Sequence, residues 1–378
     1  MLNLRRMAAI ARKESLHVMR DWRSLYLAMG IPVALILLFG YALNMDLENV
    51  PTAVWDQSRT PESRELLSFF DGSPYYAIES YHDGYDALET ALLSRRVMIA
   101  LVIPSDFADK LHANRPVAVQ VISDGSDATT ARLALGYASA LGLIYNHNLL
   151  AERIALMGRG PLREPLLLDA RAWYNPDLRS ENDIIPGIIA VVLIVISAML
   201  TSVTVAREWE MGTMEQLIST PIRVPEIVLG KVFPYFVIGM ADITIAMLMG
   251  RLLFHVPLRG HPALVFATGA IFLTGALFLG LMLSINLKKQ VLANQIALFV
   301  SYLPTLLLSG FVFAIENMPR PLQLITYIVP ARYFIALLRG IYLKGIGLEV
   351  LWLNALLLAI YAAFMVIMAH KRMKLKLE

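Results

Sequence analysis

Residues 207–225 read REWEMGTMEQLISTPIRVP, and this charged segment separates two long apolar runs, residues 184–206 and 232–250. Three glutamates fall in its first half, Gly212 interrupts it and two prolines end it, a pattern typical of a short helix that faces water. An isolated helix this short is marginal in water, so the pattern predicts that the segment docks on another surface. A plain charged loop between two membrane spans is the alternative.

The composition places this segment in a membrane protein. Hydrophobic residues make up 57% and charged residues 17% of the 378 positions, and the mean hydropathy is +0.59. A soluble globular protein of this length is much less apolar, so a chain that crosses the membrane several times is expected. Cysteine is absent, which excludes disulfides and thiolate chemistry.

Charge divides the chain into two parts. Residues 45–183 hold 12 Lys and Arg against 20 Asp and Glu, a net charge of −8. The rest of the 33 basic and 30 acidic residues, 21 against 10, give the remainder a net charge of +11. Positive charge gathers on the cytoplasmic side of membrane proteins. The basic part therefore predicts cytoplasmic flanks and gives no support for nucleic-acid binding, and the acidic part predicts a domain outside the cytoplasm.

The first 45 residues predict a surface helix followed by a membrane span. Residues 1–23 carry six basic side chains, and their apolar side chains recur at helical spacing, which favours an amphipathic helix on the inner membrane surface. A flank that is merely positive is the alternative. Residues 24–45 hold 22 positions without a basic or acidic side chain, enough to cross about 30 Å of hydrocarbon. This run is too long for a cleaved signal peptide, so the N-terminus is expected inside.

Residues 46–183 are expected to form a mixed α/β domain outside the cytoplasm. Short β-rich runs alternate there with helical stretches, which favours a layered arrangement. The predicted strands cover residues 52–55, 75–80, 97–103 and 117–122. The predicted helices cover residues 61–70, 85–94, 105–113 (with Ser105 as N-cap) and 128–157.

The rest of the chain predicts five more spans. Residues 184–206 form the second span, residues 207–225 are cytoplasmic, residues 226–369 hold four more spans, and residues 370–378 form a basic cytoplasmic tail. The four later spans are expected at residues 227–254, 263–287, 291–315 and 350–369. The predicted fold is a polytopic α-helical membrane protein. It has six transmembrane helices, a mixed α/β extracytoplasmic domain between the first two, and re-entrant helices before the last.

Residues 316–347 are apolar, but prolines divide them into pieces too short to cross a bilayer. Re-entrant or interfacial helices fit this pattern, and an apolar outer loop is the alternative. Arg332, Arg339 and Lys344 would then lie on the outer side, against the usual distribution of positive charge.

Sequence motifs for catalysis are absent. The chain has no Gly-x-x-x-x-Gly-Lys phosphate loop, no His-Glu-x-x-His zinc motif and no Gly-x-Ser-x-Gly nucleophile motif. It is therefore not expected to be an enzyme or to hold a cofactor or metal. Asp124, Ser126 and Asp127 suggest a site, but a capped turn explains them better.

Asp242 is an ionisable residue deep inside a predicted span. Placing a carboxylate there costs about 2.5–3.5 kcal/mol, so the side chain should face a protein interior or a wet cavity. A structural hydrogen bond and a role in binding substrate or an ion are both open.

Four blocks of sequence resemble the type-2 permeases of ABC transporters. The charged segment supplies Arg207-Glu208-x-Glu210-x-Gly212-Thr213-x-Glu215-x-Leu217, followed by Thr220-Pro221, Glu226 and Gly230-Lys231. The other blocks are Arg12-Lys13-Glu14 with Arg20-Asp21, Leu308-Ser309-Gly310-Phe311 with Glu316-Asn317-Met318-Pro319, and Pro330-Ala331-Arg332-Tyr333 with Leu338-Arg339-Gly340. The blocks match in order and membrane position over essentially the whole chain. The nearest likeness is to the multidrug subgroup with a large outer domain. Ala314, where many members have proline, and Met211, where a basic residue is common, depart from the pattern.

The resemblance implies a half-transporter of the bacterial inner membrane that exports lipophilic or amphipathic compounds. It would pair with a second permease, identical or related, and with two cytoplasmic ATPase subunits that bind ATP and Mg, and a periplasmic adaptor could receive the compound. The implied coupling residues are Arg207, Glu208, Glu210, Gly212, Thr213, Glu215, Leu217 and Pro221. The implied N-terminal contact residues are Arg12, Lys13, Glu14, Arg20 and Asp21. The implied re-entrant residues are Gly310, Glu316, Pro319, Pro330, Arg332 and Arg339.

Three other functions stay open at this point. An ion-extruding ABC permease could have the same layout. A proton-coupled secondary carrier could use Asp242, although no paired half-repeat is visible. A membrane-anchored sensor could bind a ligand with its acidic outer domain, although six spans exceed what such a sensor needs.

Overall fold

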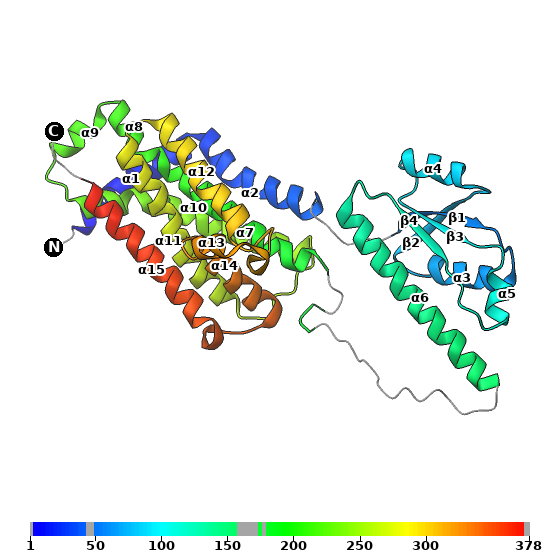
Figure 1. The fold of residues 1–378 in the computed structure, drawn as a ribbon. Helices are drawn as coiled ribbons and strands as arrows, with labels where there is room; N and C mark the ends of the chain where they lie inside the picture. The colour runs from blue at the N-terminus through cyan, green and yellow to red at the C-terminus, as the bar shows by residue number, and fades with distance from the viewer. Residues whose placement is uncertain (1–2, 43–48, 157–172, 176–178, 374–378) are drawn as a thin grey trace. The chain divides into compact units, whose positions relative to one another are not determined.

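The computed structural model describes residues 3–42, 49–156, 173–175 and 179–373 (Figure 1). The chain divides into two compact units. One, here called the helical unit, combines Met1–Asn44 with Arg171–Glu378, and the other, the α/β unit, is Met45–Ala170. The predicted outer domain ends at residue 183, whereas a helix of the helical unit already begins at Glu181.

The helical unit is built from long apolar helices. They are α2 (Trp22–Ala42), α7 (Glu181–Ser202) with α8 (Thr204–Glu210), α10 (Val224–Leu252), α11 (Pro262–Leu287), α12 (Gln290–Leu308) and α15 (Leu348–Arg372). Within the described residues, five helices are long and apolar enough to cross a membrane. A bent pair brings the number to six, while α2 contributes a shorter apolar helix, Ala28–Ala42. The chain is therefore a helical protein with about five to six apolar spans.

Helix α7 forms the centre of this unit, and most of its side chains are buried. Helix α11 packs closely against it, because a Cβ atom on Gly280 would overlap the carbonyl oxygen of Ala198. On the same core, the rings of Phe272 and Phe334 stack with their centroids 4.2 Å apart. Close packing of this kind fixes the relative positions of the helices.

The segment before the last span bends sharply. Helix α13 (Arg320–Thr326) and helix α14 (Pro330–Arg339), which continues into a π-helical turn (Gly340–Lys344), meet at 82°. This is the geometry of a broken span or a re-entrant loop. The fifth span was predicted to reach residue 315, and this is wrong, because Gly310 has φ +82°, outside the helical region.

The α/β unit contains a four-stranded sheet in the order β2-β1-β3-β4. The strands are β1 (Val50–Asp56), β2 (Tyr76–Tyr81), β3 (Ile99–Ile103) and β4 (Gln120–Ser123). β1 runs parallel to both β2 and β3, whereas β4 is antiparallel to β3 at the edge. Each strand overlaps a predicted one, although the hydrogen-bonded part of β4 begins three residues later than predicted.

Four helices accompany the sheet: α3 (Pro61–Asp71), α4 (Tyr85–Leu93), α5 (Phe107–His112) and α6 (Ala128–Leu156). Helices α3 and α6 pack on one face, where Phe70 and Ala138 share a core with Leu101. Helix α4 packs on the other face, where Leu88 meets Ala100. Both faces of β3 are therefore covered, which explains its unbroken apolar run.

Two local predictions in this unit can be compared with the structure. Ser105 is not the N-cap of α5; Asp106 takes that position, because the N–H of Phe107 is held in a turn by the carbonyl of Pro104. The turn before α6 does use its polar side chains for capping. Asp124 accepts a hydrogen bond from the N–H of Ser126 at 2.9 Å, and this bond holds the pKa of the carboxyl below its ordinary value.

Candidate functional site at the α1–α8–α10 junction

The charged segment, residues 207–225, forms two short helical pieces. Helix α8 continues the line of α7 and ends at Glu210, Gly212 takes φ +70°, and α9 (Thr213–Ile218) follows. The prediction of one short helix is wrong, because the left-handed glycine turns the chain and separates the two pieces. Figure 1 shows α8 and α9 at the end of the helical unit where both chain termini lie.

Helix α9 is anchored on one side and free on the other. Met214 is buried, and Leu217 and Ile218 pack against the same apolar cluster as Ile227 of α10. Met211, Glu215, Gln216 and Pro221 are exposed. The outer face thus presents one carboxylate among uncharged side chains.

Helix α1 (Leu4–Arg20) lies directly against α10. A Cβ atom on Gly230 would lie 2.8 Å from Cβ of Ile10, so only glycine allows this approach. The carboxylate of Glu226 accepts the N–H of Asn3 at 2.8 Å and the N–H of Arg223 at 3.1 Å. One carboxylate therefore holds the beginnings of both helices, as expected where unpaired N–H groups collect.

Beneath α8, charged side chains from three helices meet in a buried ion cluster. Nζ of Lys231 (α10) lies 2.9 Å from Oε1 of Glu208 (α8) and 3.6 Å from Oε2 of Glu14 (α1). Nζ of Lys13 reaches the same Oε1 of Glu208 at 2.9 Å, and the hydroxyl of Tyr235 donates to Oε1 of Glu14 at 3.1 Å. The two cations and two carboxylates balance in charge.

This buried ion cluster is costly to disturb. Lys231 is 2% exposed, Glu208 4% and Glu14 5%. Oε2 of Glu208 is buried and has no hydrogen-bond partner among the described residues. Removing one member of a buried pair leaves an uncompensated charge, at a typical cost of about 3–5 kcal/mol. The position of α8 relative to α1 and α10 is therefore held by charge as well as by packing.

The end of α8 is also tied to α12. Glu210 accepts hydrogen bonds from the backbone N–H of Gln290 at 2.9 Å and from its side-chain amide at 2.5 Å. Arg207 donates through Nε to Oε1 of Gln290 at 3.2 Å and also contacts His17 of α1. Nζ of Lys288 stands 4.4 Å from the ring centroid of Trp209. These contacts fix the start of the charged segment between α1 and α12.

The structure thus separates the predicted coupling residues into two groups. Arg207, Glu208 and Glu210 point their side chains to neighbouring helices, whereas Glu215 and Pro221 stay on the exposed face. Gly212 makes the turn, and the hydroxyl of Thr213 donates to the carbonyl of Glu208 at 3.4 Å.

The predicted N-terminal contact residues divide in the same way. Glu14 and Lys13 belong to the buried ion cluster, Arg12 and Arg20 are exposed, and Asp21 caps α1. Sequence reasoning missed the structural part played by Lys231, Tyr235, Glu226 and Gln290. Lys231 is a cation at the start of an apolar run, but that position alone does not distinguish it from an ordinary charge that flanks a span.

Asp242 lies in the middle of α10 and is 3% exposed. Its Oδ1 is buried and has no hydrogen-bond partner among the described residues. A structural hydrogen bond through this atom is therefore not formed within the described chain, and its role stays a prediction.

At the far end of the helical unit, Arg339 of α14 forms an ion pair with Asp183 of α7. Its Nε and Nη2 lie 2.6 Å and 2.9 Å from the two carboxylate oxygens, and Nη1 donates to the carbonyl of Gly310 at 3.1 Å. Arg332 contacts the hydroxyl of Thr326 and stands 4.0 Å from the ring centroid of Tyr327. Both arginines of the predicted re-entrant segment are thus engaged.

The other re-entrant residues frame this region. Pro330 begins α14, Pro319 precedes α13, and Glu316 is exposed. A pocket of about 490 Å³ lies beside Glu316, and its lining also includes Asp183, Gly310, Arg332 and Arg339, but not the two prolines. Polar and charged groups from α7, α14 and the α12–α13 connection therefore surround one hollow.

Comparison with known proteins shows which family combines these features. Residues 22–371 match the model of the ABC-2 family transporter proteins. This chain belongs to that family. The ABC-2 chain is 34% identical over 379 residues to the probable multidrug ABC transporter permease YbhS of Escherichia coli, covering all of this chain and 99% of the relative.

Two further relatives agree. The probable multidrug ABC transporter permease YbhR of Escherichia coli is 28% identical over 92% of each chain. The inner membrane transport permease YhhJ of the same organism is 26% identical over 85% of the ABC-2 chain and 84% of its own length. The ABC-2 chain is therefore a multi-pass membrane permease of an ABC transporter, and in this family of permease subunits a separate ATPase hydrolyses ATP.

Proposed function

We propose that this ABC-2 chain is the membrane-spanning subunit of an ATP-driven exporter, and that the exposed face of α9 is the surface on which a cytoplasmic ATPase docks. The observation that carries the proposal is the exposed face of α9, whose opposite side shares one apolar cluster with α1 and α10. The preceding helix α8 is joined to the same two helices by the buried ion cluster. A push on α9 would therefore be passed to α1 and α10 through this packing. The apolar spans and the relatives named multidrug permease support a lipophilic or amphipathic, drug-like substrate.

The assembly proposed here has two permeases and two ATPases. The second permease is an identical or related chain, and ATP and Mg bind to the ATPase subunits. The α8–α9 end, both termini included, faces the cytoplasm of a bacterium, because the basic residues concentrate there. The α/β unit, inserted between α2 and α7, then lies on the periplasmic side, where a periplasmic adaptor would meet it.

Docking is tested by reversing the charge on the exposed face of α9. The native chain and the Glu215→Lys variant are purified in detergent from the native host, and ATPase activity is measured in each eluate. Glu89→Lys, an exposed glutamate of α4, is the matched control. We expect ATPase to be recovered with the native chain and the control, and to be strongly reduced with Glu215→Lys, while membrane insertion is equal in all three.

Two outcomes would contradict this proposal. Equal ATPase recovery with Glu215→Lys would show that this face does not bind the ATPase. No ATPase with any variant would favour the proton-coupled carrier. The buried Oδ1 of Asp242, which finds no hydrogen-bond partner in the part of the chain that the structure describes, supports that alternative.

A further inference from the structure

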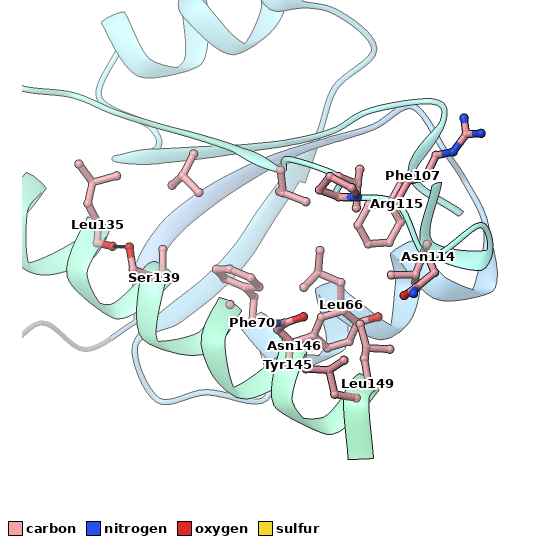
Figure 2. A pocket seen from close by; sticks show the side chains of 18 residues that line it. Leu66, Phe70, Phe107, Asn114, Arg115, Leu135, Ser139, Tyr145, Asn146 and Leu149 are labelled. Atoms are coloured by element: carbon pink, nitrogen blue, oxygen red, sulfur yellow. Dashed lines mark hydrogen bonds between the residues drawn. The ribbon is translucent and has the colours of Figure 1, made fainter. Parts of the chain in front are cut away.

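A cavity of about 570 Å³, open to solvent on one side, lies in the α/β unit between α6 and the edge of the sheet (Figure 2). Drug-sized ligands occupy pockets of roughly 300–1,000 Å³ in proteins, so its size fits a small organic molecule. The apolar side chains around it include Leu66, Phe70, Phe107, Val117, Val119 and Val121. The cavity is thus part of the same face of the sheet that α3 and α6 cover.

The chain before β4 explains why space remains there. β4 is an edge strand, and its pairing with β3 begins only at Gln120. The preceding residues run extended, with Val117 and Val119 half-buried on one side and Ala118 exposed on the other. Val117 and Val119 continue the apolar face of the sheet beyond the last hydrogen bonds between β3 and β4. Helix α6 does not fill the space over these two valines.

Helix α6 leaves this space open at a glycine. Gly142 lines the cavity in the middle of the helix, and a Cβ atom built on it meets nothing within 4 Å. A glycine inside a helix costs about 0.5–1 kcal/mol relative to alanine. Alanine at this exposed position would favour the helix and meet no neighbour, so Gly142 leaves the mouth of the cavity open at some cost in helix stability.

The lining also defines the chemistry of the occupant. Arg115 is the one charged side chain among the described residues that line the cavity, and Asn114 and Asn146 add amides. Figure 2 shows Asn114 and Arg115 at the end of the cavity near Phe107, with the exposed guanidinium of Arg115 pointing away from the other labelled side chains. No acidic side chain is among those lining residues, although residues 45–183 carry a net charge of −8. The site is therefore unsuited to a cation.

We propose that this cavity binds a small lipophilic molecule, neutral or anionic, with its apolar body against the valines and phenylalanines and an acceptor group toward Asn114, where the exposed side chain of Arg115 reaches it by changing its rotamer. The site lies outside the predicted spans, and its binding does not depend on ATP-driven export. It would make the α/β unit a receptor for small molecules in its own right.

The test uses the fact that the chain contains no cysteine. Ser139 and its neighbour Ala140 are both exposed, but only Ser139 lines the cavity. The full-length chain carrying Ser139→Cys or Ala140→Cys is placed in lipid nanodiscs, and the rate of maleimide modification is measured. The probes are 1-anilinonaphthalene-8-sulfonate, which is anionic, and N-phenyl-1-naphthylamine, its neutral counterpart. Both probes should slow modification of Ser139→Cys about tenfold, a binding preference of about 1.4 kcal/mol, and leave Ala140→Cys unchanged.

Three second-site variants sharpen the result. Gly142→Leu should place a side chain across the cavity beside Ser139 and abolish protection of Ser139→Cys. Gly136→Leu, the same change at an equally exposed position of α6 that does not line the cavity, should keep the protection. Arg115→Ala should raise the concentration of the anionic probe needed for protection about tenfold, without changing that of the neutral probe.

The proposal is wrong if the probes protect neither cysteine or both equally, since binding would then be absent or confined to lipid. It is also wrong if protection survives Gly142→Leu. Should that variant fail to fold, the comparison of Ser139→Cys with Ala140→Cys in the native background still decides.

Discussion

The buried ion cluster gives the most demanding prediction. Lys231→Met replaces the central cation by an uncharged side chain of similar length, and Lys231 is 2% exposed, so water cannot compensate at the site. Two carboxylates lose a cation, Glu208 at 2.9 Å and Glu14 at 3.6 Å. Each keeps one partner, Lys13 for Glu208 and Tyr235 for Glu14. The loss should therefore fall within the usual range for a broken buried pair, about 3–5 kcal/mol.

Thermal unfolding of the purified chain in detergent, followed by fluorescence of its five tryptophans, measures this loss. For a domain of this size one kcal/mol shifts Tm by about 2–4 °C, so Lys231→Met should lower Tm by about 6–20 °C. The control is Lys289→Met, which removes an exposed lysine near the same end of the unit and should change stability by no more than about 0.5 kcal/mol.

A double variant separates charge from packing. Lys231→Met with Glu208→Gln restores charge balance around Lys13 and Glu14, so it should recover a substantial part of the lost Tm. The reasoning fails if Lys231→Met and Lys289→Met unfold at the same temperature. It also fails if Glu208→Gln lowers the Tm of Lys231→Met by as much again as Lys231→Met lowers that of the native chain.

Three further changes test other features. Gly212→Ala should lower the free energy of unfolding by about 1–2 kcal/mol, because φ there is +70°, and Gly212→Asn should lower it less. Equal Tm values for the native chain and both variants would show that this left-handed turn does not require glycine. Gly280→Ala should destabilise the protein by about 1–3 kcal/mol, because the new Cβ atom overlaps Ala198. Gly136→Ala, which faces open space, should be neutral or stabilising. No loss of stability in Gly280→Ala would show that α7 and α11 can move apart. Asp242→Asn should preserve membrane insertion and export in a vesicle dye-export assay. A neutral amide is easier to bury than a carboxylate whose Oδ1 has no hydrogen-bond partner among the described residues. Loss of export with normal insertion would show that Asp242 binds the transported compound or a coupled proton.

Features governed by local sequence were predictable. Uncharged runs of span length locate α7, α11 and α15, and runs rich in β-branched residues locate the strands. The errors fall where a local exception matters: Gly310 ends α12 inside an apolar run, and Gly212 splits the charged segment.

The ion cluster could not be predicted in the same way. Glu14, Glu208 and Lys231 are far apart in sequence, and each looks like an ordinary charge flanking a span. Only the close crossing of α1 over Gly230 brings them together. The cavity of the α/β unit is likewise a tertiary feature, because a glycine within a helix does not reveal which space it leaves open.

The line of α7 and α8 joins two distant ion pairs. Asp183, in the first turn of α7, holds Arg339 of the bent segment, and Glu208, in α8, holds Lys231. The 25 residue steps from Asp183 to Glu208 span about 38 Å at 1.5 Å per residue. Most of the α7 side chains along this length are buried, which leaves the helix little room to bend. A small axial shift imposed at Glu208 would therefore be passed along α7 to the ion pair at Arg339, and the short break at Val203 between α7 and α8 is the place where such a shift could be absorbed.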